Sequence, residues 1–347
     1  MKTNAYKYLS PLIIYAFAFI AFTKTGWLCW LAIIYAWLFI PLVELLIQPN
    51  EQNLTEAEEV LVKKDKLYDY ILYTIVLLQV PTVFFFLYQM QQSNLSGLDI
   101  VARVLTMGLL CGTFGINVAH ELGHRITFFE QSLAKISLLT SLYTHFFIEH
   151  NKGHHKHVAT LNDPSSARKG EMVYLFYCRT IVFTYVNAWK IANAETKKKG
   201  KPVFSLYNEM LQLQLLQICF VGLIFLLFGL QGTMYFLLAA VNGILLLETV
   251  NYIEHYGLQR KQLEGGKYER AMPNHSWNSN HIIGRLMLFE LSRHSDHHYM
   301  ASRKYQLLRH HNDSPQMPTG YPGMMILSLI PPLWFYIMHK QIKLYDV

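Results

Sequence analysis

The chain alternates between long apolar runs and shorter polar segments, and the apolar runs set the predicted architecture. Several approach the ~20 residues that a helix needs to cross a bilayer. We therefore predict an all-α integral membrane protein with about six transmembrane helices in one membrane-embedded domain, residues 1–347. Residues 133–147 and 173–192 are too short or too charged to span and are predicted to be interfacial helices. The six predicted spans are residues 8–22, 27–47, 68–88, 98–119, 211–228 and 233–250.

Lysine and arginine are unevenly distributed among the polar segments. Three lysines precede the third span, and the segments 121–210 and 251–347 are rich in both residue types. The connections 89–97 and 229–232 contain neither. By the positive-inside rule, the basic segments and the N-terminus face the cytoplasm.

The composition narrows the possible functions. Apolar residues make up 52% of the chain and charged residues only 15%, and the net charge is +7. A basic surface suits anionic lipid or an acidic protein partner. No nucleic-acid-binding module accompanies the charge, so nucleic acid is not expected as a partner. The four cysteines are scattered singly, which predicts neither a disulfide framework nor a metal bound by cysteine.

Four short stretches hold nine of the sixteen histidines, and all four fall on the predicted cytoplasmic side. His120 and His124 are one helical turn apart, so both rings project from one helix face. His294, His297 and His298 have the i, i+3, i+4 spacing that also places three rings on one face. Neutral imidazole is a ligand for iron, zinc, copper and nickel. The remaining members are His150, His154 and His155 in a third stretch and His255 at the end of the sixth span.

Three other interpretations of these histidines are open. Residues 120–124 alone match the His-Glu-x-x-His signature of zinc proteases, but nine histidines exceed the needs of one four-coordinate zinc. Structural histidines would account for one or two of the nine. A membrane metal transporter or sensor would place ionisable residues deep within its spans, whereas here they lie near span ends. Two metal ions sharing the nine is the simplest interpretation, and iron activating dioxygen suits a site fed from a bilayer, because zinc has no redox chemistry.

The sequence around the histidines resembles a known family. The motifs that carry the resemblance are residues 145–155, 251–258, 275–281 and 318–323, together with the histidine stretches. They are similar to those of the membrane-bound alkane 1-monooxygenases, which are integral-membrane non-haem di-iron hydroxylases. The resemblance extends from about the second span to Gly323. Xylene-type methyl hydroxylases and acyl desaturases share the histidine motifs and remain alternatives.

This resemblance implies terminal hydroxylation of medium- to long-chain n-alkanes to 1-alkanols, with O2 as co-substrate and two iron ions as cofactor. It also implies a bacterial inner-membrane enzyme with its active site facing the cytoplasm. The implied iron ligands are His120, His124, His150, His154, His155, His255, His294, His297 and His298, and their division between the irons stays open. The carboxylates Glu121, Glu149, Glu254, Asp296 and Asp163 are expected to hold the orientation of the imidazoles.

An alkane offers no polar group, so we expect a long apolar tunnel among the spans. Ala36 and Trp37 are candidate lining residues, Ala36 being small among large neighbours. Electrons are expected from a separate rubredoxin or ferredoxin with its NAD(P)H reductase, since no fused rubredoxin domain is expected. Such carriers are typically acidic. Lys152, Lys156, Arg168 and Lys169 are candidate docking residues.

Overall fold

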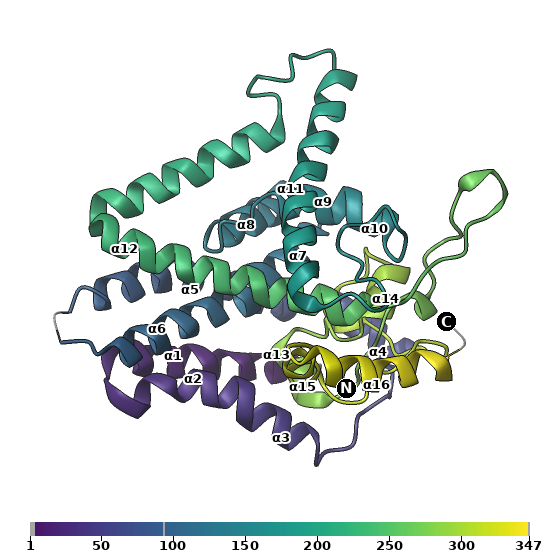
Figure 1. Cartoon of the computed structure of the whole chain (residues 1–347), viewed down its shortest axis with the longest axis horizontal. Coiled ribbons are helices and arrows are strands. Elements are labelled where there is room, and N and C mark those ends of the chain that lie inside the picture. Colours follow the sequence, from purple (N-terminus) through teal and green to yellow (C-terminus); the bar gives the residue numbers. More distant parts are fainter. Residues whose placement is uncertain (1–3, 93, 346–347) are drawn as a thin grey trace.

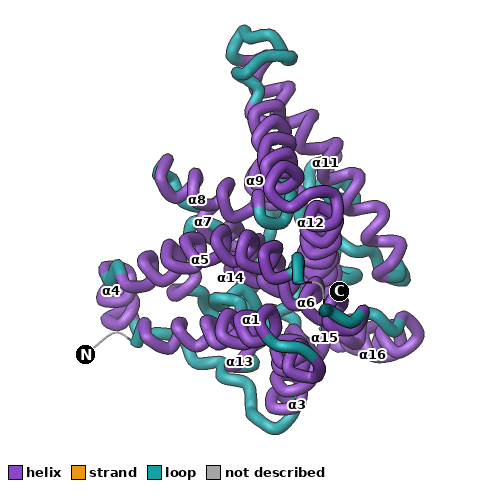
Figure 2. The backbone as a smooth tube through the Cα atoms, turned by 90° about the vertical axis from the view of Figure 1, so that its left-hand side faces the viewer, coloured by secondary structure: helices purple, strands orange, loops and turns teal. Residues whose placement is uncertain are grey.

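The computed structural model describes residues 4–92 and 94–345, and this part of the chain is almost entirely helical (Figures 1 and 2). Within these residues, β-structure is limited to two isolated bridges. The N-terminal half comprises η1 (Ala5–Leu12), α1 (Ile13–Thr23), η2 (Gly26–Trp30), α2 (Leu31–Ile34), η3 (Tyr35–Phe39), α3 (Ile40–Glu44), α4 (Glu56–Lys64), α5 (Leu67–Gln89), α6 (Gly97–Leu110), η4 (Cys111–Ile116), α7 (Asn117–Gly123), α8 (Phe128–Leu139), α9 (Phe146–Glu149), η5 (His150–His154) and α10 (His155–His157). The C-terminal half comprises α11 (Val173–Lys198), α12 (Glu209–His255), η6 (Glu264–Gly266), η7 (Pro273–His275), α13 (Ile282–Met287), α14 (His294–Tyr299), η8 (Tyr305–Leu307), α15 (Tyr321–Ser328) and α16 (Pro331–Leu344).

Five continuous helical stretches in the described residues are long and apolar enough to cross a membrane. This confirms the predicted all-α membrane architecture. The first four stretches contain or closely match the first four predicted spans. The fifth, α12, contains both remaining predicted spans, which meet at a non-helical residue, Gly229. The five stretches are Ala5–Thr23, Gly26–Glu44, Leu67–Gln89, Gly97–Gly123 and Glu209–His255.

The change of direction within α12 occurs at Gly229. This residue has φ 66° and ψ −171°, whereas the rest of the element is helical. A positive φ is readily adopted by glycine and costly for other residues. Figure 1 shows the α12 ribbon turning back at its far end, so the predicted spans 211–228 and 233–250 lie on its two arms.

Glycines bring the fourth span against the second arm of α12. A Cβ on Gly243 would lie 2.7 Å from the Cβ of Cys111, and one on Gly108 would lie 2.6 Å from the Cβ of Asn242. Small residues allow helix backbones to approach closely in a membrane, where packing replaces the hydrophobic drive. This close pairing carries the histidines at the ends of α7 and α12 to the same end of the helix bundle.

Helices α8, α9 and α11 cover the two stretches that were predicted to be interfacial helices. The predicted stretch 133–147 is divided between the second half of α8 and the start of α9. The stretch 173–192 lies within α11, which Figure 1 shows running across the direction of α5 and α6. Val182, Phe183 and Val186 of α11 are exposed, as expected for a helix that contacts lipid with one face.

Candidate metal centre

The four histidine stretches converge at one end of the bundle. Ligating nitrogens of the nine histidines form two groups, and within each group all of these atoms lie within 4.8 Å of one another. We call these groups the five-histidine cluster and the four-histidine cluster. The five-histidine cluster consists of His120, His124, His150, His155 and His297, and the four-histidine cluster consists of His154, His255, His294 and His298.

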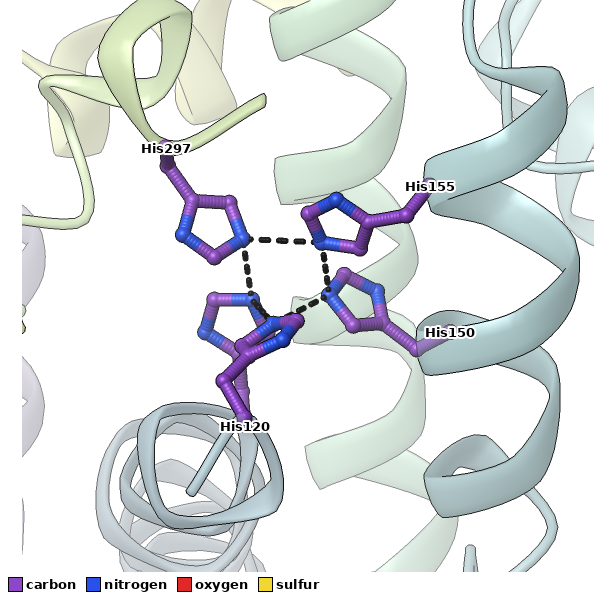
Figure 3. Close-up of side chains that lie close together, drawn as sticks. His120, His150, His155 and His297 are labelled. Atoms are coloured by element: carbon purple, nitrogen blue, oxygen red, sulfur yellow. Dashed lines mark hydrogen bonds between the residues drawn. The ribbon is translucent and has the colours of Figure 1, made fainter. Parts of the chain in front are cut away.

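The Nε2 atoms of the five-histidine cluster form a closed ring, part of which is visible in Figure 3. Going round this ring, successive nitrogens are 2.9 to 3.4 Å apart. The distances are His120 to His297 2.9 Å, His297 to His155 3.0 Å, His155 to His150 3.0 Å, His150 to His124 3.2 Å and His124 to His120 3.4 Å.

Hydrogen bonding alone cannot satisfy a ring of five such nitrogens. An imidazole nitrogen either carries a proton and donates or has a lone pair and accepts. Donors and acceptors must alternate around a closed ring, and an odd number of atoms makes complete alternation impossible. A central cation removes the conflict, because all five nitrogens then offer lone pairs. At metal–nitrogen distances of about 2.0–2.1 Å, neighbouring ligands lie roughly 3 Å apart, as they do here. The residues therefore fit a metal ion.

The four-histidine cluster has the same kind of convergence. The Nε2 atoms of His294 and His298 are 2.9 Å apart, and His255 Nε2 lies 3.2 Å from that of His294. His154 Nε2 lies 3.3 Å from His298 Nε2. All four rings are buried. This second group is also suited to a metal ion.

Two pairs of adjacent residues divide between the clusters. His154 belongs to the four-histidine cluster and His155 to the five-histidine cluster, and His297 and His298 are divided in the same way. The two clusters come close at His155 of one and His298 of the other, whose ring centroids are 4.5 Å apart. The clusters therefore share two short backbone segments, which hold them next to each other.

Burial keeps most of these imidazoles in the form that binds metal. It lowers the pKa of His124 to about 3 and places the pKa values of His150, His155 and His297 well below the usual value. Neighbouring histidines lower them further. Uncharged imidazole is therefore favoured at neutral pH, and its lone pair is available to a cation.

Among the five expected carboxylates, Asp163 makes the clearest contact with a cluster histidine. The Nδ1–H of His154 donates to Asp163 Oδ2 at 2.9 Å, and the hydroxyl of Ser166 donates to the same oxygen at 2.6 Å. Burial lowers the pKa of His154, but the charge of Asp163 and this hydrogen bond outweigh burial and raise it overall. The bond leaves Nε2 directed at the four-histidine cluster, as carboxylate partners of metal-binding histidines do.

Glu254 approaches the same cluster differently. Its Oε2 lies 3.2 Å from the Nε2 of His294, the nitrogen that faces the cluster. The Glu254 carboxylate therefore lies on the side of the imidazole that faces the candidate metal, whereas Asp163 contacts the opposite nitrogen of its histidine.

The other three carboxylates contact groups outside the clusters. Glu121 accepts from the guanidinium of Arg125 at 2.6 Å. Glu149 accepts from Asn187 Nδ2 at 3.0 Å. Both carboxylate oxygens of Asp296 accept from Arg303 Nη1 at 2.6 Å, and Oδ1 also accepts from His311 Nε2 at 2.7 Å. Their neighbours fix the backbone beside the ligands, and a direct role in holding the imidazoles stays a prediction.

The partners of Asp296 were not identified from the sequence. Arg303 and His311 follow the last histidine stretch by several residues without a recognisable motif. Asp296 is 0% exposed and lies between His294 and His297 in the chain. A buried carboxylate needs a positive or hydrogen-bonding partner. The position of Asp296 inside a histidine stretch was therefore the one signal in the sequence that such a partner lies nearby.

A largely apolar cavity lies among the membrane-spanning helices and extends to both clusters. Its walls include Ala36 and Trp37, the two residues expected at a tunnel, and small or apolar residues from α6, η4 and α12. Histidines from each cluster contribute to it, together with Glu254. The cluster histidines in its lining are His120, His150 and His294.

The four candidate docking residues are exposed on the surface. Lys152 also forms an ion pair with Glu195 at 2.8 Å, so part of its charge is compensated. Lys156, Arg168 and Lys169 form no ion pair among the described residues of this structure.

Comparisons with known proteins agree with this arrangement. A family model described as "Fatty acid desaturase" matches residues 99–328, which include all nine cluster histidines. The chain is 38% identical to alkane 1-monooxygenase 2 of Pseudomonas aeruginosa, over 91% of this chain and 84% of that protein. The chain belongs to the alkane 1-monooxygenase family.

Two further relatives show the range of this similarity. Alkane 1-monooxygenase 1 of Pseudomonas aeruginosa is 46% identical over 70% of this chain, a match that spans 63% of that protein. The hydroxylase component of the xylene/toluene monooxygenase of Pseudomonas putida is 28% identical over 72% of this chain and 66% of its own length. The resemblance seen in the sequence motifs to the alkane 1-monooxygenase family is confirmed.

Proposed function

We propose that this protein hydroxylates the terminal methyl group of medium- to long-chain n-alkanes. The reaction is R–CH3 + O2 + 2 electrons + 2 protons → R–CH2OH + H2O. The observation that carries the proposal is the apolar cavity that reaches histidines of both clusters. A hydrocarbon bound there has its end beside the candidate metal site.

We propose that each cluster holds one iron ion, with His120, His124, His150, His155 and His297 at one and His154, His255, His294 and His298 at the other. The convergent neutral nitrogens and the odd ring of Nε2 atoms support this assignment. Imidazole suits iron among other metals, and family membership favours iron. When bound, the irons supply the one-electron and dioxygen chemistry that side chains lack.

The protein's own part is to bind and orient the alkane. Apolar side chains of the cavity, including Ile40, Leu247 and Met325, bind the chain by excluding water. Asn117 and Glu254 are among the few polar groups in the lining, so the reacting end meets polar atoms only near the clusters. The apolar walls also keep water away from the site of oxidation.

We propose that the electrons come from a separate rubredoxin or ferredoxin, reduced by an NAD(P)H-dependent reductase. The exposure of Lys152, Lys156, Arg168 and Lys169 supports docking of an acidic carrier near the clusters, since complementary charge speeds the association of proteins. The positive-inside pattern supports a cytoplasmic orientation of this surface.

The deciding experiment combines metal analysis with product analysis on the purified full-length protein. We expect about two irons per chain, and 1-octanol and 1-hexadecanol from the corresponding alkanes when rubredoxin and its reductase are supplied. Xylene and a fatty acyl substrate are tested in parallel. Iron without 1-alkanol, but with a methyl-hydroxylated aromatic or a desaturated acyl product, would move the assignment to another histidine-motif enzyme. Stoichiometric zinc without oxidation would exclude the mechanism.

A further inference from the structure

A chain of aromatic rings leads from the five-histidine cluster to the surface of α11. The ring of Phe146 stacks on that of His150, with centroids 4.6 Å apart and planes inclined by 23°. Phe146 also stacks with Tyr143, with centroids 6.2 Å apart and planes inclined by 28°. His145 meets Tyr143 edge to face at 4.2 Å, and Tyr185 meets His145 in the same manner at 5.2 Å. The order is therefore His150, Phe146, Tyr143, His145, Tyr185.

The inner members of this chain are buried, and its outer end is accessible. Tyr143 is 2% exposed, whereas Tyr185 is 38% exposed. Burial lowers the pKa of His145 to about 3, so its ring is uncharged. The Nε2 atom of His145 has no hydrogen-bond partner among the described residues. Neither Tyr143 nor His145 lines the cavity, so the alkane-binding walls do not account for them.

Tyr143 differs from the other members because its hydroxyl faces a buried base. The O–H donates to Glu248 Oε1 at 2.7 Å. The other oxygen of Glu248 accepts from Thr180 Oγ1 at 2.9 Å and Asn251 Nδ2 at 3.1 Å. No ion pair of the described residues involves Glu248, which is 1% exposed. Burying a carboxylate with only neutral partners is costly, and packing alone gives no reason for it.

We propose that Tyr143 is a redox-active residue that supplies one electron to the metal centre when dioxygen is activated without an alkane in the cavity. In this step the phenol O–H bond breaks, the electron passes through Phe146 and His150, and the proton moves to Glu248 Oε1. Tyr143 is oxidised to a neutral phenoxyl radical, and the metal centre is reduced by one electron. A one-electron carrier then supplies an electron through Tyr185 and His145, and the proton returns from Glu248 Oε1, which restores the phenol.

This inference rests on the proposed function, because an oxygen-activating metal centre must supply the oxidant. Its physical logic is that a phenol gives up an electron far more easily when its proton can move at the same time to a hydrogen-bonded base. Glu248 is placed for that transfer. The aromatic chain would then direct an unused oxidising equivalent away from the histidines, which would otherwise be oxidised themselves.

The test is electron paramagnetic resonance of the full-length, iron-loaded protein, reduced and then mixed with O2 without alkane. We expect a tyrosyl radical whose spectrum changes when ring-deuterated tyrosine is incorporated. Tyr143→Phe keeps the ring and removes the O–H, and it should lower the radical yield at least tenfold. Tyr252→Phe is the matched control, because Tyr252 is buried with its hydroxyl bonded to the carbonyl of Glu171 and should leave the yield unchanged.

A second variant keeps the test decisive if Tyr143→Phe does not fold. Glu248→Gln retains an accepting oxygen but is a much weaker base, so it should also reduce the radical yield severalfold. Equal radical yields in wild type and both variants, or oxygen consumption without any tyrosyl radical, would overturn the inference. A Tyr143 radical in a protein that consumes O2 but forms no 1-alkanol would support it while refuting alkane hydroxylation.

Discussion

His154 and His155 are neighbours in the chain, yet their rings lie in different clusters. The Nε2 of His154 approaches His298, and that of His155 approaches His150 and His297. Two consecutive residues therefore contribute ligands to two different candidate metal sites. This relationship allows the contributions of the two clusters to be separated by single substitutions.

Replacing either residue should remove about one of the two metal ions. His155→Ala takes one nitrogen from the five-histidine cluster, and His154→Ala takes one from the four-histidine cluster. Metal content per chain, measured on purified protein by mass spectrometry, should fall from about two toward one in each case. His157→Ala is the control, because His157 lies two residues further on and outside both clusters. Full metal retention in both variants would show that the clusters do not bind metal as proposed.

Asp163→Asn should weaken metal binding without removing a ligand. The amide cannot match the carboxylate as an acceptor for His154 Nδ1–H, and groups that orient a ligand in this way typically contribute about 10–100-fold in metal affinity. Competition with a chelator would measure the change. Asn162→Ala, at an exposed neighbouring position, should leave the affinity as it is. An Asp163→Asn variant with wild-type affinity would assign the carboxylate to local folding alone.

Ala36→Phe should shorten the usable length of the cavity. Ala36 lines it, and a phenyl group there occupies space that a long hydrocarbon needs. We expect the rate on hexadecane to fall at least tenfold and the rate on octane to fall much less, as measured by 1-alkanol formation. Leu38→Phe, two residues away at a position that is 55% exposed, should leave the ratio of the two rates unchanged. If Ala36→Phe lowered the rates on both alkanes equally, the long hydrocarbon would not extend past position 36.

Gly243→Ala should destabilise the pairing of the fourth span with α12. The added Cβ would lie 2.7 Å from Cys111 Cβ and 3.1 Å from the backbone nitrogen of Gly112. Overpacking of this kind costs about 1–3 kcal/mol in free energy of unfolding. Thermal unfolding in detergent would report it. Gly222→Ala lies in the other arm of α12, where a Cβ meets nothing within 4 Å, and should be neutral or stabilising. Equal unfolding temperatures would contradict the close contact.

The features that the sequence could predict are those with a period or a motif. The apolar runs predicted the spans, and the spacings of His120 with His124 and of His294 with His298 predicted shared helix faces. The connection predicted at 229–232 coincides with the turn at Gly229. Its backbone conformation could not be predicted, because glycine adopts positive and negative φ about equally readily.

The partners of the carboxylates could not be predicted for a different reason. Adjacency to a histidine does not determine where a side chain points. Glu121 is next to His120 but turns to Arg125, whereas Asp163 is eight residues beyond His155 and reaches His154. These contacts depend on how distant loops pack. Likewise, the stacking of Tyr143, Phe146 and His150 depends on side-chain packing and has no signal in the sequence.

The position of the cavity among membrane-spanning helices also affects how substrate preference will be measured. An alkane partitions into the bilayer before it reaches the protein, and each added methylene favours that transfer by about 0.8 kcal/mol, or roughly fourfold in partition coefficient. A KM expressed per litre of water would therefore fall steeply with chain length even if the cavity treated every alkane alike. Intrinsic selectivity will emerge only when substrate is expressed as its mole fraction in the lipid, so the membrane itself acts as a first concentrating filter.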